Sequence, residues 1–241
     1  MTFDARVDVA GKRVLTFDCY GTLIDWETGI LNLVRPWLQA AGRSDIPDDL
    51  VLTAFALHQA RHQQPRPAPL YPEVLSRTWR DVQATFGLPD DAGQRAAFAA
   101  SAGDWPPFPD TVAALRRLSS RFALAILSNV DEASLTRSLR LLEVPFVLTV
   151  TAERVVSYKP GAPHFETAIA ELAARGYPKE SILHVAQSRN HDVDPASRFG
   201  IPTVWVDRRH DNTGTGATIA NTAVPYARVP SLAALADAAA S

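Results

Sequence analysis

The sequence predicts an α/β protein: a Rossmann-like, doubly wound parallel sheet with a helical cap inserted after the first strand. Short apolar runs, rich in β-branched residues and bounded by polar or turn residues, have the pattern of buried strands. Segments with apolar residues three or four positions apart lie between them, as in amphipathic helices. Strands that alternate with helices form a parallel sheet covered on both faces. We expect strands at residues 13–18, 122–128, 146–151, 182–187 and 202–207.

Helical segments of the core are expected to cover this sheet. In residues 111–119 the apolar side chains Val112, Leu115 and Leu118 lie on one stripe. Residues 132–142 and 164–175 repeat the pattern, and each of these segments follows a predicted strand. This order is typical of crossover connections between parallel strands.

The stretch from residue 28 to residue 105 breaks the alternation of strand and helix. It contains helical patterns at 30–41, 48–63 and 72–86, and a proline cluster at 106–109 indicates a stiff return to the sheet. We therefore expect a core made of residues 1–27 and 106–241 and a cap made of residues 28–105. An insertion after the first strand would lie over the carboxyl ends of the strands, where open α/β sheets bind ligands, so the cap could act as a lid.

Composition and charge exclude several classes of protein. A net charge of −2 over 241 residues gives no electrostatic footprint for nucleic acid or for an anionic membrane. The single cysteine, Cys19, excludes a disulfide framework and a cysteine-rich zinc site. No apolar run approaches the ~20 residues of a membrane span, and the first residues lack the pattern of a signal peptide. We expect a cytoplasmic globular protein that binds neither nucleic acid nor a membrane.

The strongest chemical signal is the segment FDCYGTL at the end of the first predicted strand. A carboxylate that closes a buried strand, here Asp18, is costly unless it is used or paired. Gly21 permits a tight turn after it, and Thr22 offers a hydroxyl back toward the carboxylate. Taken alone, Asp18 could equally cap the following turn.

Other polar residues follow the later strands. Ser128 and Asn129 follow the second strand, Lys159 follows the third, and Asp192 lies just past the fourth. Because a parallel sheet brings these loops together in one crevice, we expect the side chains to meet Asp18 there. Each has a structural alternative: a strand-end turn for Ser128, a solvated surface position for Lys159, and a cap on the helix 192–199 for Asp192.

Aspartate, serine, lysine and aspartate in this order resemble the motifs of the haloacid dehalogenase (HAD) superfamily. The resemblance extends over nearly the whole chain: DCYGTLID is similar to the first motif, LSN to the second, YKP to the third and SRNHD to a divergent fourth. The segment FDCYGTLIDWE is especially similar to the type II 2-haloacid dehalogenases. The order and spacing specify the superfamily much better than they specify a substrate.

The resemblance implies catalytic roles for three residues. Asp18 would be a nucleophile that forms an ester or an acyl phosphate, which water then cleaves. Lys159 would keep that carboxylate ionised by its positive charge. Asp192 would either orient Lys159 or help to deprotonate the hydrolytic water.

The resemblance also implies a set of residues that bind the substrate. Hydroxyl, amide or backbone N–H groups near the nucleophile would hold the carboxylate of the substrate. A cap arginine would bind the halide, with Arg61 and Arg66 as candidates by region. The substrate-binding residues expected on this basis are Tyr20, Thr22, Ser128, Asn129, Gln187 and Arg61.

Two departures from the phosphatases of the superfamily favour a halide leaving group. Those enzymes carry an acidic proton donor two residues after the nucleophile, where this chain has Tyr20, and a phenol with a reference pKa of about 10 is a poor acid. Metal-dependent members place an acidic ligand five residues before the final aspartate, where this chain has Gln187. Mg²⁺ prefers anionic oxygen ligands, so we expect no metal and no cofactor.

The expected function is therefore metal-independent displacement of halide from a small 2-haloalkanoic acid through an ester on Asp18. Alternatives on the same scaffold are hydrolytic opening of a C–N ring in a cyclic amino acid and a phosphatase, which alone would require Mg²⁺. An inactive binding module with this fold is the alternative that is not an enzyme. The expected partner is a small carboxylate substrate, and the chain could form a homodimer.

Overall fold

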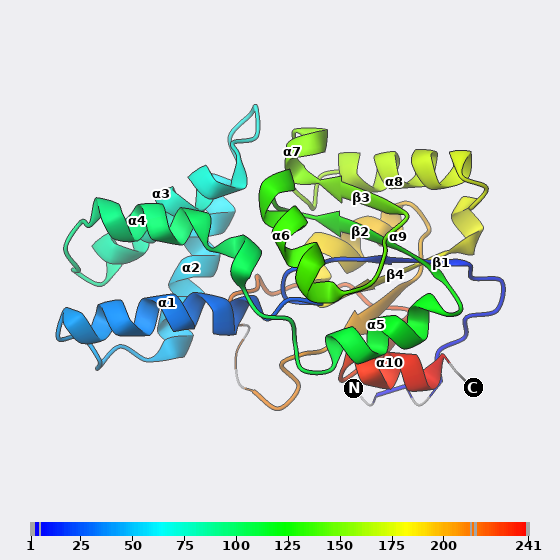
Figure 1. The fold of residues 1–241 in the computed structure, drawn as a ribbon, viewed down its shortest axis with the longest axis horizontal. Helices are drawn as coiled ribbons and strands as arrows, with labels where there is room; N and C mark the ends of the chain where they lie inside the picture. The colour runs from blue at the N-terminus through cyan, green and yellow to red at the C-terminus, as the bar shows by residue number, and fades with distance from the viewer. Residues whose placement is uncertain (1–2, 5, 213, 215, 240–241) are drawn as a thin grey trace.

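The computed structural model describes residues 3–4, 6–212, 214 and 216–239 and shows a parallel sheet with a helical unit beside it (Figure 1). Within these residues the sheet has six strands in the order β3-β2-β1-β4-β5-β6, and every neighbouring pair is parallel. The sequence prediction of an α/β fold with a doubly wound parallel sheet is confirmed. The strands are β1 (Val14–Phe17), β2 (Ala123–Ser128), β3 (Leu148–Thr151), β4 (Ile182–Ala186), β5 (Thr203–Val206) and β6 (Ala227–Val229).

Successive residues of a strand point to opposite faces, and this alternation divides the core into two apolar clusters. Leu15 belongs to one cluster, with side chains of α5 (Thr111–Ser119), α6 (Glu132–Leu142) and α10 (Leu232–Ala238). Val14 belongs to the other, with α8 (Pro163–Ala174) and α9 (Asp194–Arg198). Both faces of the sheet are therefore covered, as its continuous apolar strands require.

The cap consists of helices between β1 and α5 and stands apart from the sheet (Figure 1). Trp79, Phe98 and Phe55 pack in its interior, with Trp79 stacked on Phe98 at 5.5 Å between ring centroids. This aromatic cluster gives the cap a core of its own. Its helices are α1 (Trp26–Ala40), α2 (Asp48–His62), α3 (Tyr71–Thr85), α4 (Ala92–Ala100) and the short η1 (Ala102–Asp104).

Helix starts follow capping rules that can be read in the sequence. Asp25 accepts a hydrogen bond from the backbone N–H of Thr28 at the start of α1, at 3.1 Å. Asp131 does the same for Ser134 at the start of α6, at 2.9 Å. Such caps satisfy N–H groups that have no partner within the helix. Helix α1 begins at Trp26, two residues before the predicted cap boundary.

The structure adds elements that the sequence analysis did not predict. Strand β6 has three residues, which is too short for a recognisable alternation. Helix α4 buries only Phe98, and α10 is rich in alanine, so neither shows a clear apolar stripe. The remaining short elements are α7 (Ala152–Val155), η2 (Lys179–Ser181) and η3 (Arg189–Val193). None of the helices in the described residues has the length and apolar character needed to cross a membrane.

Candidate active site

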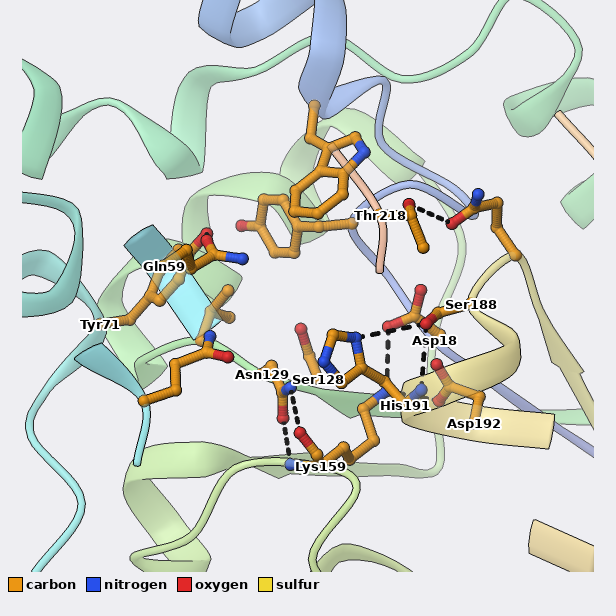
Figure 2. A pocket seen from close by; sticks show the side chains of 15 residues that line it. Asp18, Gln59, Tyr71, Ser128, Asn129, Lys159, Ser188, His191, Asp192 and Thr218 are labelled. Carbon is orange, nitrogen blue, oxygen red and sulfur yellow. Dashed lines mark hydrogen bonds and ion pairs between the residues drawn. The ribbon is translucent and has the colours of Figure 1, made fainter. Parts of the chain in front are cut away.

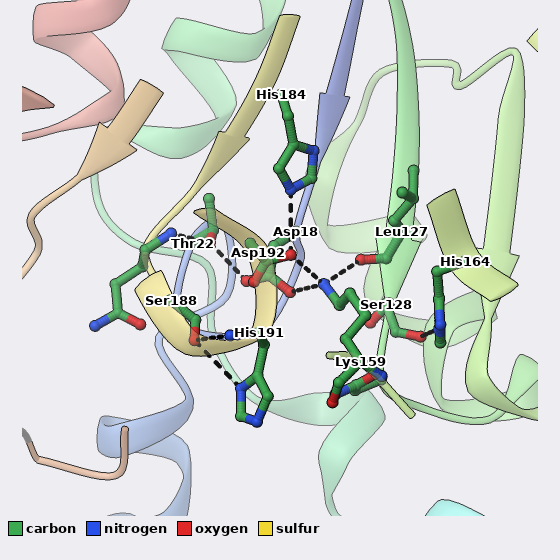
Figure 3. Close-up of polar contacts among 12 residues, drawn as sticks. Asp18, Thr22, Leu127, Ser128, Lys159, His164, His184, Ser188, His191 and Asp192 are labelled. Carbon is green, nitrogen blue, oxygen red and sulfur yellow. Dashed lines mark hydrogen bonds and ion pairs between the residues drawn. The ribbon is translucent and has the colours of Figure 1, made fainter. Parts of the chain in front are cut away.

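The predicted polar residues meet at the carboxyl edge of the sheet. Asp18 directly follows β1, Ser128 ends β2, Lys159 lies in the loop after α7, and Asp192 lies in η3 after β4. Figure 3 shows Asp18, Lys159 and Asp192 directed toward one another. The parallel topology places these loops at one edge, as expected.

The Lys159 ammonium lies at the centre of this group. Its Nζ donates to Asp18 Oδ1 at 2.9 Å, to Asp192 Oδ1 at 2.6 Å and to the carbonyl oxygen of Leu127 at 2.7 Å. A lysine ammonium has three donors, and all of them are used. Because the side chain is only 1% exposed, the alternative of a solvated surface lysine is wrong.

Burial and charge shift the protonation of the three groups in different directions. Burial raises the pKa of Asp18, and the positive charge of Lys159 opposes this only in part. Burial acts on Asp192 in the same sense, but Lys159 and a hydrogen bond from His184 outweigh it and lower the pKa of Asp192. Burial alone would lower the pKa of Lys159, and the two carboxylates raise it instead. The ammonium therefore stays charged between them.

The loop after β1 holds the Asp18 carboxylate in place. Thr22 Oγ1 donates to Asp18 Oδ2 at 2.6 Å and accepts from the backbone N–H of Gln187 at 2.9 Å. Gly21 has a φ of +93°, and a Cβ there would lie 3.1 Å from the Trp26 ring nitrogen, so glycine is required at this turn. Thr22 is fully buried and does not line the cavity. The expectation that Thr22 contacts the substrate is therefore corrected: its hydroxyl positions Asp18.

Ser128 and Asn129 have different roles. The Ser128 hydroxyl lines the cavity and has no hydrogen-bond partner among the described residues. The Asn129 side chain accepts from the backbone N–H of Lys159 at 2.7 Å and donates to the carbonyl of Lys159 at 3.1 Å. Asn129 thus fixes the lysine loop, and Ser128 keeps a free hydroxyl that faces the cavity.

Asp192 is joined by a residue that sequence reasoning missed. His184 Nε2 lies 3.1 Å from Asp192 Oδ1, the oxygen that also accepts from Lys159. Asp192 Oδ2 has no partner within the described part of the chain. Since the Asp192 side chain bonds Lys159 and His184, the helix-cap alternative for it is wrong. A histidine in the middle of the apolar strand ILHVA was the signal that could have identified His184.

Tyr20 and Gln187 both line the cavity, and neither carries a carboxyl group. The Tyr20 hydroxyl is hydrogen-bonded to Ser138 Oγ at 2.7 Å, and burial raises the pKa of Tyr20 well above its usual value. It is therefore a poorer proton donor than a free phenol. Gln187 Oε1 accepts a hydrogen bond from Thr218 at 3.1 Å.

The cavity above Asp18 has a volume of about 40 Å³, and residues of both the core and the cap line it. Figure 2 shows Gln59 and Tyr71, from α2 and α3, across the cavity from Asp18. The Tyr71 hydroxyl donates to Gln59 Oε1 at 2.9 Å. Arg61, expected to bind the substrate, is exposed and does not line this cavity, because the turn of α2 directs Gln59 inward instead. The other cap residues that line it are Trp26 and Gln63.

The chain is thus an α/β protein with a helical cap and a buried carboxylate–ammonium–carboxylate group at the carboxyl edge of its sheet. Buried titratable groups with shifted pKa values beside a cavity are typical of active sites. The model of the haloacid dehalogenase-like hydrolase family matches residues 12–200. The chain belongs to this family.

Curated relatives agree with this assignment. The chain is 33% identical to an (S)-2-haloacid dehalogenase from Pseudomonas putida over 107 residues, which are 43% of this chain and 45% of that protein. It therefore spans less than half the length of this relative. It is 26% identical over 205 residues to (S)-2-haloacid dehalogenase 4A from Burkholderia cepacia, covering 83% and 85% of the two chains.

The fold is shared with a solved structure as well. An L-2-haloacid dehalogenase from Xanthobacter autotrophicus, solved with chloropropionic acid covalently bound, superposes with a TM-score of 0.74 at 19% identity. The superposition covers 93% of this chain and 97% of that one.

Proposed function

We propose that this protein hydrolyses the carbon–halogen bond of a small 2-haloalkanoic acid without a metal ion. The observation that carries the proposal is the Lys159 ammonium between Asp18 and Asp192, at 2.9 and 2.6 Å. It supplies the positive charge that keeps a buried nucleophilic carboxylate ionised. The similarity to (S)-2-haloacid dehalogenases supports the choice of substrate.

The first step would be displacement at carbon. An Asp18 oxygen bonds to the carbon next to the substrate carboxylate while the carbon–halogen bond breaks and the halide leaves with the electron pair. Among the described residues, each Asp18 oxygen accepts one hydrogen bond, so each keeps a lone pair for attack. The free hydroxyl of Ser128 would hold the substrate carboxylate. A halide needs no proton to leave, which is consistent with Tyr20 at the position of the missing acid.

The second step would be hydrolysis of the ester. A water oxygen bonds to the Asp18 carboxyl carbon, and Asp192 Oδ2 takes one of its protons. The bond from that carbon to the alcohol oxygen then breaks, and the proton passes to the alcohol. A 2-hydroxy acid is released, the second water proton goes to solvent, and Asp18 is restored.

The donors at this site do not fit Mg²⁺. The Oδ1 atoms of Asp18 and Asp192 both bond the Lys159 ammonium, which holds the position between the carboxylates where a cation would lie. The third position that metal-dependent relatives use is the neutral Gln187, whose oxygen already accepts from Thr218. Among the described residues, no group of three or more histidine, cysteine or acidic side chains is arranged to hold a metal.

A single turnover in ¹⁸O-labelled water tests the proposal. With 2-chloropropionate and excess enzyme, we expect chloride release and ¹⁸O incorporation into the peptide containing Asp18 after the ester is hydrolysed. Chelator should leave the rate unchanged. Label found only in the product, or Mg²⁺-dependent release of phosphate from an aryl phosphate without release of chloride, would refute the proposal.

A further inference from the structure

His184 lies in the middle of β4 and does not reach the cavity. It is fully buried, and its ring packs edge-on against Phe165, with ring centroids 5.3 Å apart. Nδ1 lies 2.9 Å from Thr16 Oγ1 on the neighbouring strand β1, and Nε2 lies 3.1 Å from Asp192 Oδ1. Both ring nitrogens therefore have partners, although the other residues of the strand are apolar. Figure 3 shows the contact between His184 and Asp192.

The partners define the direction of these hydrogen bonds. An ionised Asp192 can only accept, so Nε2 of His184 carries a proton and donates it. In the neutral ring Nδ1 then accepts, and the Thr16 hydroxyl is its donor. A chain of hydrogen bonds thus runs from Thr16 through His184 to Asp192 Oδ1. Lys159 donates to the same oxygen.

These contacts make the two oxygens of Asp192 different. Oδ1 accepts from both Lys159 and His184, whereas Oδ2 accepts from no described residue. Asp192 is 0% exposed, yet it lines the cavity above Asp18. Two donors on one oxygen fix the rotation of the carboxylate and so fix where Oδ2 lies. Lys159 alone cannot do this, because it is shared with Asp18.

We propose that His184 is a positioning residue for the hydrolytic half of the reaction: it holds Asp192 by Oδ1 so that Oδ2 can take the proton of the attacking water. This role rests on the proposed function. The displacement step uses Asp18 and Lys159 and does not need Oδ2. The loss of His184 should therefore slow hydrolysis of the ester much more than its formation.

Two variants separate hydrogen bonding from packing. His184→Phe keeps an aromatic ring against Phe165 and removes the donor, whereas His184→Gln gives up the ring and retains an N–H donor near the position of Nε2. Rapid-quench chloride release would follow ester formation from 2-chloropropionate, and intact-mass spectrometry would follow the ester on Asp18.

We expect His184→Phe to release one equivalent of chloride per site in a burst and to accumulate the ester. Its hydrolysis should be about 10- to 100-fold slower, the factor expected when one hydrogen bond to a charged group is lost. His184→Gln should retain most of the hydrolytic rate. If only packing matters, the ranking of the two variants is reversed, and that result would overturn the proposal.

The remaining outcomes are also decisive. Equal slowing of chloride release and hydrolysis in His184→Phe, or no slowing of either, refutes the positioning role while the proposed function stands. If the wild-type protein releases no halide from any 2-haloalkanoic acid, the proposed function fails and the positioning role fails with it.

Thr16→Val provides an independent test should His184→Phe fail to fold. Valine is close to threonine in shape, and the substitution removes only the hydroxyl that holds Nδ1. We expect a smaller accumulation of the ester, with hydrolysis slowed about 3-fold, as for the partial loss of one neutral hydrogen bond. Unchanged partitioning between ester and product in this variant would count against the proposal.

Discussion

At the scale of single residues, Lys159 links the stability of the protein to its chemistry. It is buried between two carboxylates, so its removal leaves negative charges in the interior without a cation. We expect Lys159→Met to lower the free energy of unfolding by about 3–5 kcal/mol at pH 7, as for other buried pairs that lose one partner.

The sign of the pH dependence of this variant follows from the same charges. Without Lys159, the pKa values of the buried Asp18 and Asp192 rise, so the folded state binds protons more readily than the unfolded state. The destabilisation should therefore be largest at neutral pH and shrink as the pH falls toward 5. Urea unfolding of Lys159→Met and the wild-type protein at pH 7.5 and at pH 5 measures this destabilisation. Lys179→Met, at an exposed lysine, is the control and should change stability by less than about 0.5 kcal/mol.

We expect the ionisation of Asp18 to determine the pH at which activity falls on the acid side of the pH profile. Burial raises the pKa of Asp18, and only the ionised carboxylate is a nucleophile. We expect kcat/KM to fall with decreasing pH at values above the ordinary aspartate range, and to rise to a plateau once Asp18 is ionised. A pH profile of halide release by the wild-type protein measures this limb. An acid limb at or below the pKa of a free aspartate would contradict the assignment.

At the scale of elements, Asn129 joins the loop after β2 to the loop that carries Lys159. It makes hydrogen bonds to both the N–H and the C=O of Lys159. We expect Asn129→Ala to cost about 1–3 kcal/mol of unfolding free energy, since two hydrogen bonds are lost. Halide release should slow at least about 10-fold because the ammonium shifts from its carboxylates.

Thermal unfolding and steady-state halide release check this prediction together. Asn212→Ala, at an exposed position in the same protein, is the matched control and should leave both quantities near wild type. A variant of Asn129 with full activity would show that the bridge between the loops is not needed.

At the scale of the whole molecule, the cavity depends on the placement of the cap over the core. Arg209, in the core loop after β5, forms ion pairs with Glu27 at the start of α1 and with Asp49 at the start of α2. Glu27 also accepts from the backbone N–H of Ala217 at 2.8 Å. These contacts join the first turns of α1 and α2 to the segment after β5, so we expect them to hold the cap against the core.

We expect Arg209→Ala to raise KM about 10-fold with a smaller change in kcat, because the substrate must then bring the cap into place at the expense of its own binding energy. Thermal stability should fall by only a few degrees. Arg77→Ala, which removes an exposed ion pair within α3, is the control and should leave KM unchanged. Equal KM values for the two variants would show that Arg209 does not hold the lid.

The sequence by itself determined the layout of the protein. Apolar runs and intervening helical stripes predicted five of the described strands, and helices 111–119 and 132–142 match α5 and α6. The order of Asp18, Ser128, Lys159 and Asp192 along the chain placed them at one edge, because parallel strands all end on the same side of a sheet. These features repeat locally along the chain, so they can be read without the fold.

Only the tertiary structure decided which atoms meet. A histidine within an apolar strand marks His184 as unusual but does not show that its ring reaches Asp192. That contact depends on how η3 folds back over β4. Likewise, the sequence pointed to Arg61 by region, but the rotation of α2 directs Gln59 into the cavity. Hydrogen bonds between distant segments depend on distances below 3.5 Å, which packing sets and local sequence does not encode.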